Sequence, residues 1–246
     1  MILEVKDLKK SFGGILAVHN VTFKLEAREI SSIIGPNGAG KTTLFNLITG
    51  KLLPDEGEVL FNGEDISRLQ PFQICHKKLG RSFQITNIFP KLSVYENIQV
   101  AILSARGINK NLFNRADRMV KKETIEILEN LGLAEKKNLL GGLLAHGDQK
   151  LLDIGISLAS NPDLILLDEP TAGMSPQETV KTTGLVNQLA KEKGMTVLLI
   201  EHDMNVVFSI SEVIRVMHQG ELIAEGKPEE IKSNSRVQQI YLGEQV

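Results

Sequence analysis

The chain has 246 residues, enough for one or two domains with a sizeable core. Its 28 basic and 30 acidic residues leave a formal net charge of −2. A chain with this near balance of charge lacks the excess of basic residues that is typical of nucleic-acid-binding proteins, so we expect no nucleic acid partner. The 42% hydrophobic and 24% charged content excludes bulk disorder, and the single cysteine, Cys75, excludes an internal disulfide framework.

Neither a membrane span nor a signal peptide is predicted. The strongest apolar runs, Leu164–Leu167 and Val197–Ile200, are far shorter than the roughly 18 apolar residues of a span. The segment Met1–Asp7 shows no basic region followed by an apolar one. We therefore expect a cytoplasmic protein that reaches a membrane only through a partner.

The first third of the chain is predicted to contain strands around one helix. Alternating apolar and polar residues predict half-exposed antiparallel strands at Ile2–Lys6 and Val21–Leu25. Ile30–Ile34 is predicted as a short strand that ends at a glycine-rich turn, and helical spacing of apolar residues follows over Thr42–Ile48. Leu52–Ile66, with its Asn-Gly turn, predicts a hairpin.

The middle of the chain has few strand signals and two predicted helices, Ala116–Leu131 and one after Gly147. Beyond it, the apolar runs Leu164–Leu167 and Thr196–Ile200 predict buried strands on either side of a helix over Gln177–Lys193. Short apolar strands that alternate with helices are typical of a parallel sheet covered on both faces. The chain is therefore predicted to be an α/β protein with a helical insertion.

A phosphate-binding loop is predicted between the third strand and the first helix. Gly35–Thr42 fits the pattern G-x-x-x-x-G-K-[ST], whose glycines let backbone N–H groups surround phosphate oxygens at the positive end of a helix. Lys41 is expected to reach the β- and γ-phosphates, and the Thr42 hydroxyl to bind Mg²⁺. The loop residues assigned to the nucleotide are Asn37, Gly38, Ala39, Gly40, Lys41, Thr42 and Thr43.

An acidic pair, Asp168 and Glu169, comes directly after the predicted strand Leu164–Leu167. The carboxyl ends of parallel strands form the edge at which α/β proteins bind ligands, so we expect both carboxylates beside the phosphate loop. Asp168 is predicted to hold Mg²⁺ through water. Glu169 is predicted to accept a proton from the attacking water in hydrolysis.

With these residues the chain resembles the ATP-binding subunits of ABC transporters over essentially its whole length. The resemblance implies an α/β P-loop NTPase fold with a RecA-like core, an N-terminal antiparallel β subdomain and a helical insertion. It implies one ABC ATPase domain over 1–246, in which 1–92 and 160–246 form the core with the β subdomain and 93–159 form the helical subdomain. The implied cofactors are ATP and Mg²⁺.

Further residues match positions of this family outside the phosphate loop. The resemblance implies that Phe12 stacks on adenine, with Val18 packed beside it. It implies that Gln84 contacts Mg²⁺ and senses the membrane partner, and that His202 contacts the γ-phosphate. The predicted catalytic residues are thus Glu169, His202 and Gln84, and the predicted metal-binding residues are Thr42, Gln84 and Asp168.

The segment Leu144–Gln149 occupies the place of the family's Leu-Ser-Gly-Gly-Gln signature but departs from it. Ala145 lacks the serine hydroxyl that would contact the γ-phosphate of a neighbour's ATP, and Asp148 replaces a glutamine. Backbone N–H groups at Ala145 and Gly147, at a helix N-terminus, are expected to keep binding phosphate. Ser175 replaces the family's usual aspartate in a nearby loop. These departures concern the site that the chain completes for a partner.

The resemblance implies a head-to-tail dimer with a second ABC ATPase subunit, either a copy or a paralogue. The run Glu201–Met204, the long polar segment Ala105–Lys122 and the ending Tyr241–Glu244 are similar to the ATPases of branched-chain amino acid importers. This similarity implies transmembrane permease partners, an indirect link to a solute-binding protein, and a position on the inner face of the cell membrane.

Other functions stay open on the sequence. Gly173-Met174 and Glu178-Thr179 are also similar to the ATPases of urea importers, and the ending is shared with the lipopolysaccharide-export ATPase. A soluble ABC protein of translation or DNA repair would carry two cassettes or a long coiled coil, and neither is predicted. A nucleotide-binding regulator that hardly hydrolyses ATP is favoured only by the departures in the signature.

Overall fold

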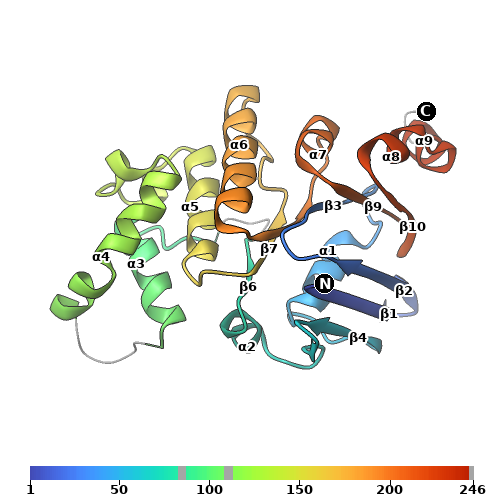
Figure 1. Cartoon of the computed structure of the whole chain (residues 1–246), viewed down its shortest axis with the longest axis horizontal. Coiled ribbons are helices and arrows are strands. Elements are labelled where there is room, and N and C mark those ends of the chain that lie inside the picture. The colour runs from blue at the N-terminus through green and yellow to red at the C-terminus, as the bar shows by residue number, and fades with distance from the viewer. Residues whose placement is uncertain (83–86, 108–112, 244–246) are drawn as a thin grey trace.

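The computed structural model describes residues 1–82, 87–107 and 113–243 (Figure 1). Within these residues the chain forms two sheets with helices around them. In chain order the elements are β1 (Leu3–Phe12), β2 (Ile15–Leu25), β3 (Ile30–Ile34), α1 (Lys41–Ile48), β4 (Glu56–Phe61), β5 (Glu64–Asp65), α2 (Pro71–His76), β6 (Leu79–Arg81), α3 (Val94–Ala105), α4 (Phe113–Asn130), the 3₁₀ turns Ala134–Lys136 and Gly141–Leu143, α5 (His146–Leu158), β7 (Leu164–Asp168), α6 (Pro176–Lys193), β8 (Thr196–Ile200), α7 (Met204–Ile210), β9 (Val213–His218), β10 (Glu221–Gly226), α8 (Pro228–Ser233) and α9 (Ser235–Gly243).

The N-terminal sheet is antiparallel, with strand order β2-β1-β4-β5. β1 pairs with β2 on one side and with β4 on the other, and Leu3 faces Leu25 across the first pair. Leu3 and Val5 are fully buried whereas the residue between them is half-buried, which is the alternation that predicts such strands. The predicted antiparallel strands and hairpin are confirmed. β1 and β2 are longer than predicted and meet at Gly13-Gly14, where both residues take positive φ angles.

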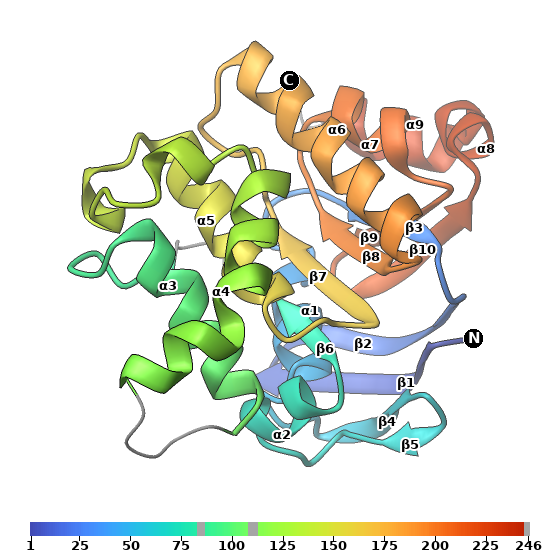
Figure 2. The same ribbon diagram turned by 60° about the vertical axis from the view of Figure 1, so that its left-hand side comes forward.

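The second sheet has the order β10-β9-β3-β8-β7-β6, and all neighbours are parallel except β10 and β9. One face packs on α1 and the antiparallel sheet, and the other packs on α5 and α6 (Figure 2). Every residue of β3, β7 and β8 is buried because both faces are covered, which explains their continuous apolar sequences. The predicted α/β fold with a covered parallel sheet is confirmed.

Helices α3, α4 and α5 lie together at one end of the molecule, and the antiparallel sheet lies toward the other (Figure 1). Ile98, Leu128 and Leu152, one from each helix, are fully buried in a shared core. Two of these helices are predicted by the sequence. α3 is not, although it begins at a capping box formed by Ser93 and Glu96.

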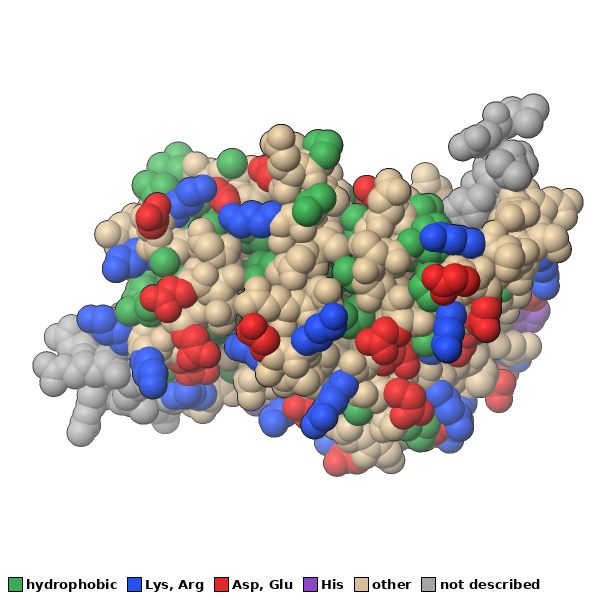
Figure 3. All heavy atoms as spheres, turned by 45° about the horizontal axis from the view of Figure 1, so that its top comes forward, with side chains coloured by type: hydrophobic (Ala, Val, Ile, Leu, Met, Phe, Trp, Pro, Cys, Tyr) green, Lys and Arg blue, Asp and Glu red, His purple; other side chains and the backbone are tan. Residues whose placement is uncertain are grey.

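Acidic and basic side chains are interspersed over the face shown in Figure 3. This mixture is what a formal net charge of −2 leads one to expect of the surface. In the part of the chain that the structure describes, no helix has the length and apolar content that crossing a bilayer requires.

Candidate nucleotide-binding and hydrolysis site

The predicted phosphate loop connects the carboxyl end of β3 to the first turn of α1, as the motif requires. Gly38 and Gly40 have φ angles of 79° and 99°, a region that favours glycine. A Cβ atom at Gly40 would lie 2.2 Å from the carbonyl oxygen of Ala17, and one at Gly35 would lie 2.1 Å from that of Met217. The loop is therefore held against β2 and β9, and only glycine fits at these two contacts.

Lys41 lies across this loop. Its ammonium group donates hydrogen bonds to the carbonyl oxygens of Gly35 at 2.6 Å and Pro36 at 2.9 Å, and the residue is only 6% exposed. Asn37 and Thr42 are exposed. A buried ammonium group next to exposed backbone at a helix N-terminus is the arrangement that binds phosphate oxygens.

Asp168 ends β7 at the same edge of the sheet, and its carboxylate is fully buried. Oδ2 accepts a hydrogen bond from Arg81 at 3.1 Å, whereas Oδ1 has no hydrogen-bond partner among the described residues. Burial raises the pKa of Asp168, and the Arg81 guanidinium opposes that rise. A buried carboxylate oxygen without a donor suits Mg²⁺ or its water, so the residues present fit the expected metal.

Arg81 is a site residue that the sequence reasoning missed. It ends β6 and donates to Asn46 at 2.7 Å and Thr49 at 2.9 Å, both on or next to α1, as well as to Asp168. Burial lowers its pKa and the charge of Asp168 opposes the shift. The signal in the sequence was weak: one arginine directly after Leu79 and a glycine, on a strand too short to show any periodicity.

Glu169 and His202 follow the neighbouring parallel strands β7 and β8, and the structure brings their side chains together. Nε2 of His202 lies 3.1 Å from Oε1 of Glu169. The Glu169 N–H donates to the Ile200 carbonyl at 2.9 Å, and Glu169 has a φ angle of 51°, which is rare for a residue with a side chain. Such backbone strain is found most often at functional sites, where surrounding contacts offset it.

The other residues expected to contact the nucleotide differ in how far their side chains are exposed. Phe12 is 46% exposed at the end of β1, with the Lys10 ammonium 5.7 Å from its ring centre. Val18 has no exposed surface and belongs to the core, so of these two residues it is Phe12 that offers an open face to a base. Gln84 lies outside the described residues.

The signature segment begins α5, with exposed Ala145 at the N-cap position. A Cβ atom at Gly147 would lie 2.8 Å from Oε1 of Glu178 in the first turn of α6, and one at Gly173 would lie 3.2 Å from Nε2 of His146. Asp148 forms an ion pair with Lys136. The signature of this chain therefore packs against the loop and first turn of α6.

Comparison with known proteins agrees with this geometry. A family model described as ABC transporter matches residues 18–172, and one described as branched-chain amino acid ATP-binding cassette transporter matches residues 221–246. The chain is 41% identical to the high-affinity branched-chain amino acid transport ATP-binding protein BraF of Pseudomonas aeruginosa, over 99% of this chain and 98% of that protein. It is 40% identical to LivG of Escherichia coli strain K12, a protein of the same description, with the same coverage.

The solved structure of an ATP-binding cassette of an ABC transporter has a TM-score of 0.87 and 33% identity, and the alignment covers 98% of each chain. The ADP conformation of such a cassette gives a TM-score of 0.86 at 32% identity, with the same coverage. Fold and site thus define a nucleotide-binding cassette with its phosphate loop at the edge of a parallel sheet. The chain belongs to the ABC transporter family, as an ATP-binding cassette that acts as an ATPase.

Proposed function

We propose that this chain is the ATP-hydrolysing subunit of an importer of branched-chain amino acids. The observation that carries the proposal is identity of 40% or more, over nearly the whole chain, with two subunits described as branched-chain amino acid transport proteins. The match of residues 221–246 to a model of the same description supports it. These residues begin at β10 and include α8 and α9.

In the proposed reaction, the N–H groups of residues 37–43 and the Lys41 ammonium bind the phosphates of ATP. Mg²⁺ would be held by the Thr42 hydroxyl, by Gln84 and by Asp168, and it would neutralise charge on the β- and γ-phosphates. Glu169 accepts a proton from the water that attacks the γ-phosphorus. The 3.1 Å contact with His202 orients Glu169. The His202 imidazole would contact the γ-phosphate.

One chain provides one phosphate loop and one signature. We therefore infer that a second ABC ATPase subunit, a copy or a paralogue, closes head to tail on this one. The N-terminus of α5, at Ala145 and Gly147, would supply N–H groups to the partner's ATP without the serine hydroxyl. We further infer that 93–159 act as a helical subdomain within a single cassette.

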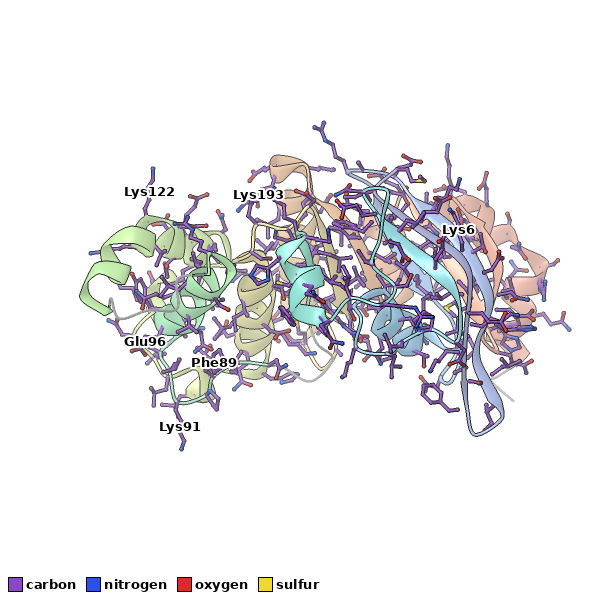
Figure 4. The ribbon with its side chains drawn as sticks, turned by 90° about the horizontal axis from the view of Figure 1, so that it is seen from below. Lys6, Phe89, Lys91, Glu96, Lys122 and Lys193 are labelled. Atoms are coloured by element: carbon purple, nitrogen blue, oxygen red, sulfur yellow. The ribbon has the colours of Figure 1, made fainter. Side chains whose placement is uncertain are left out.

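A groove between α2 and α3 of this chain is suited to bind the permease partner. A cavity of about 370 Å³ is lined by Phe72, Phe89 and Val100, which are 65%, 50% and 38% exposed, together with Ile156 of α5. Figure 4 shows Phe89 toward the end of the molecule that holds Glu96 of α3. Exposed aromatic and aliphatic residues that line a concavity favour a protein partner. We propose that the groove receives a cytoplasmic segment of the permease, which places the chain on the inner face of the membrane.

Uptake measurements in the native host test this function. Deletion of the gene should abolish high-affinity uptake of labelled leucine and valine while leaving urea uptake unchanged. The wild-type chain should restore uptake and the Glu169→Gln variant should not. Purification of the chain from gently solubilised membranes should bring along permeases, a second cassette and, through them, a solute-binding protein. Loss of urea uptake in place of leucine and valine uptake would contradict the proposal. So would purification of the chain with no membrane protein bound to it.

A further inference from the structure

Glu201 is a buried carboxylate beside the proposed catalytic pair, and the reaction described above gives it no role. It directly follows β8 and is 3% exposed. Oε1 accepts two hydrogen bonds from Thr171, one from the backbone N–H at 3.0 Å and one from the hydroxyl at 2.7 Å. Oε2 accepts a third from the backbone N–H of His202 at 3.1 Å. Glu201 thereby joins the segment after β7 to the segment after β8.

The first of these segments is a tight turn that begins at Glu169. The N–H of Glu169 donates to Ile200 at 2.9 Å, and its carbonyl accepts from the N–H of Ala172 at 3.2 Å. The φ angle of 51° at Glu169 is unfavourable for a non-glycine residue, so the turn depends on contacts that hold it. Thr171 lies inside this turn, is 6% exposed, and gives both its donors to Glu201.

The second segment is the backbone of His202. Glu201 accepts its N–H group, while the His202 imidazole, 43% exposed, reaches Glu169. One carboxylate thus binds Thr171, in the turn that begins at Glu169, and the backbone of His202, whose side chain makes the 3.1 Å contact with Glu169. Three N–H and O–H donors also compensate for removing this carboxylate from water.

We propose that Glu201 is a positioning residue for ATP hydrolysis, which holds the turn after β7 and the residue after β8 where Glu169 and His202 meet. This inference rests on the proposed role of Glu169 as the proton acceptor. The positioning role requires a hydrogen-bond acceptor at both side-chain oxygens of residue 201. Glutamine has the same size as glutamate, but one of its two terminal groups is an NH₂ donor. In either orientation of the amide, that NH₂ group would face a donor N–H, that of His202 or that of Thr171.

The test uses the full-length chain with Glu201→Gln, Thr171→Val and Thr171→Ser. We expect Glu201→Gln to lower kcat for ATP hydrolysis about tenfold or more, with the Kd for ATP within about twofold of wild type, because the loss is confined to the reacting geometry. Thr171→Val should act in the same direction, and Thr171→Ser, which keeps the hydroxyl, should restore kcat. In the Glu201→Gln/Thr171→Val double variant the two effects should be less than additive, since both disturb the hydrogen bonds of one carboxylate.

Thr124→Val is the matched control. Thr124 is buried as well, and its hydroxyl donates one hydrogen bond, to Val120 at 2.8 Å within α4. Its removal should change thermal stability and leave kcat at the wild-type value. If Thr171→Val behaves like this control, lowering the Tm with kcat unchanged, Glu201 has only a structural role and the proposal is wrong.

Comparison with Glu169→Gln distinguishes failure of the positioning role from failure of the proposed role of Glu169. If that variant loses hydrolysis while Glu201→Gln and Thr171→Val keep wild-type kcat, the positioning role fails and the proposed function stands. If Glu169→Gln hydrolyses ATP normally, the proposed role of Glu169 as proton acceptor fails, and the positioning role fails with it. Should Glu201→Gln not fold, the difference in kcat between Thr171→Val and Thr171→Ser decides, with equal values overturning the proposal.

Discussion

Arg81 carries the buried positive charge next to the proposed metal-binding carboxylate. Its side chain is 7% exposed and its guanidinium bonds Asp168, Asn46 and Thr49. A buried ion pair adds little net stability, but loss of one partner leaves the other charge buried and unpaired. The arginine therefore keeps the buried Asp168 carboxylate compatible with the folded state.

Replacing Arg81 with methionine should lower the free energy of unfolding by about 3–5 kcal/mol, as for other broken buried pairs. Urea denaturation followed by circular dichroism measures this change. Arg236→Met, at an exposed position in α9, should stay within about 0.5 kcal/mol of wild type. Similar stabilities of the two variants would show that the Arg81–Asp168 pair is not what balances this buried charge.

At the scale of elements, the β9–β10 hairpin supports the phosphate loop. Gly220, with a φ angle of 83°, donates its N–H to the carbonyl of Ala39 at 3.0 Å. A Cβ atom there would lie 3.1 Å from the carbonyl oxygen of Ala17, which also lies against Gly40. The hairpin turn and the start of β2 thus hold the loop from two sides.

Gly220→Ala should weaken ATP binding about fivefold, equivalent to about 1 kcal/mol, since the added methyl group displaces Ala17 and with it the loop. Gly63→Ala is the control, because Gly63 has a φ angle of 80° with no atom near the Cβ position. Both variants carry the strain of a left-handed alanine, about 1–2 kcal/mol. Equal ATP affinities by isothermal titration calorimetry would refute the supporting role of the hairpin.

Asp55 joins the end of β1 to the turn before β4. It accepts hydrogen bonds from the Lys10 ammonium and the Ser11 N–H, both at 2.7 Å, and from the Ser11 hydroxyl at 3.0 Å. These contacts, that of Lys10 foremost, lower the pKa of Asp55 from 3.8 to about 2. The ionised form is therefore favoured by folding, and its contribution to stability is complete above pH 3.8 and disappears as the pH falls through about 2.

The Asp55→Asn variant should accordingly be less stable than wild type at neutral pH, and the difference should shrink below about pH 4. Thermal unfolding of both proteins between pH 7 and pH 2 measures this, with pH chosen in about half-unit steps. A difference that stays constant over this range would exclude the ionised carboxylate as its source.

For the molecule as a whole, continuous apolar runs could be predicted, whereas elements without such a run and contacts between distant residues could not. β3, β7 and β8 were predictable because both their faces are buried, and the parallel arrangement then placed Asp168, Glu169 and His202 at one edge. β6 and α2, with three and six residues, are too short for a period to be visible. They form because β6 pairs with β7 and α2 packs Ile74 into the core.

The polar contacts that support the site escaped prediction for a different reason. Arg81 and Asp168 are 87 positions apart, and Thr171 and Glu201 are 30 apart, so only the folded sheet brings them together. The sequence marked Glu201 merely as an acid beside a histidine, and nothing local shows that it turns inward while Glu169 stays partly exposed. Motifs predicted the groups proposed to meet ATP, and the structure reveals what holds them.

The catalytic role of Glu169 is decided by Mg²⁺-dependent ATP hydrolysis of wild type and Glu169→Gln, with ATP affinity measured on the same preparations. We expect the variant to bind ATP within about twofold of wild type and to lose about a hundredfold or more in kcat, because only the proton acceptor has changed. Hydrolysis by Glu169→Gln at the wild-type rate would contradict the assignment of this site.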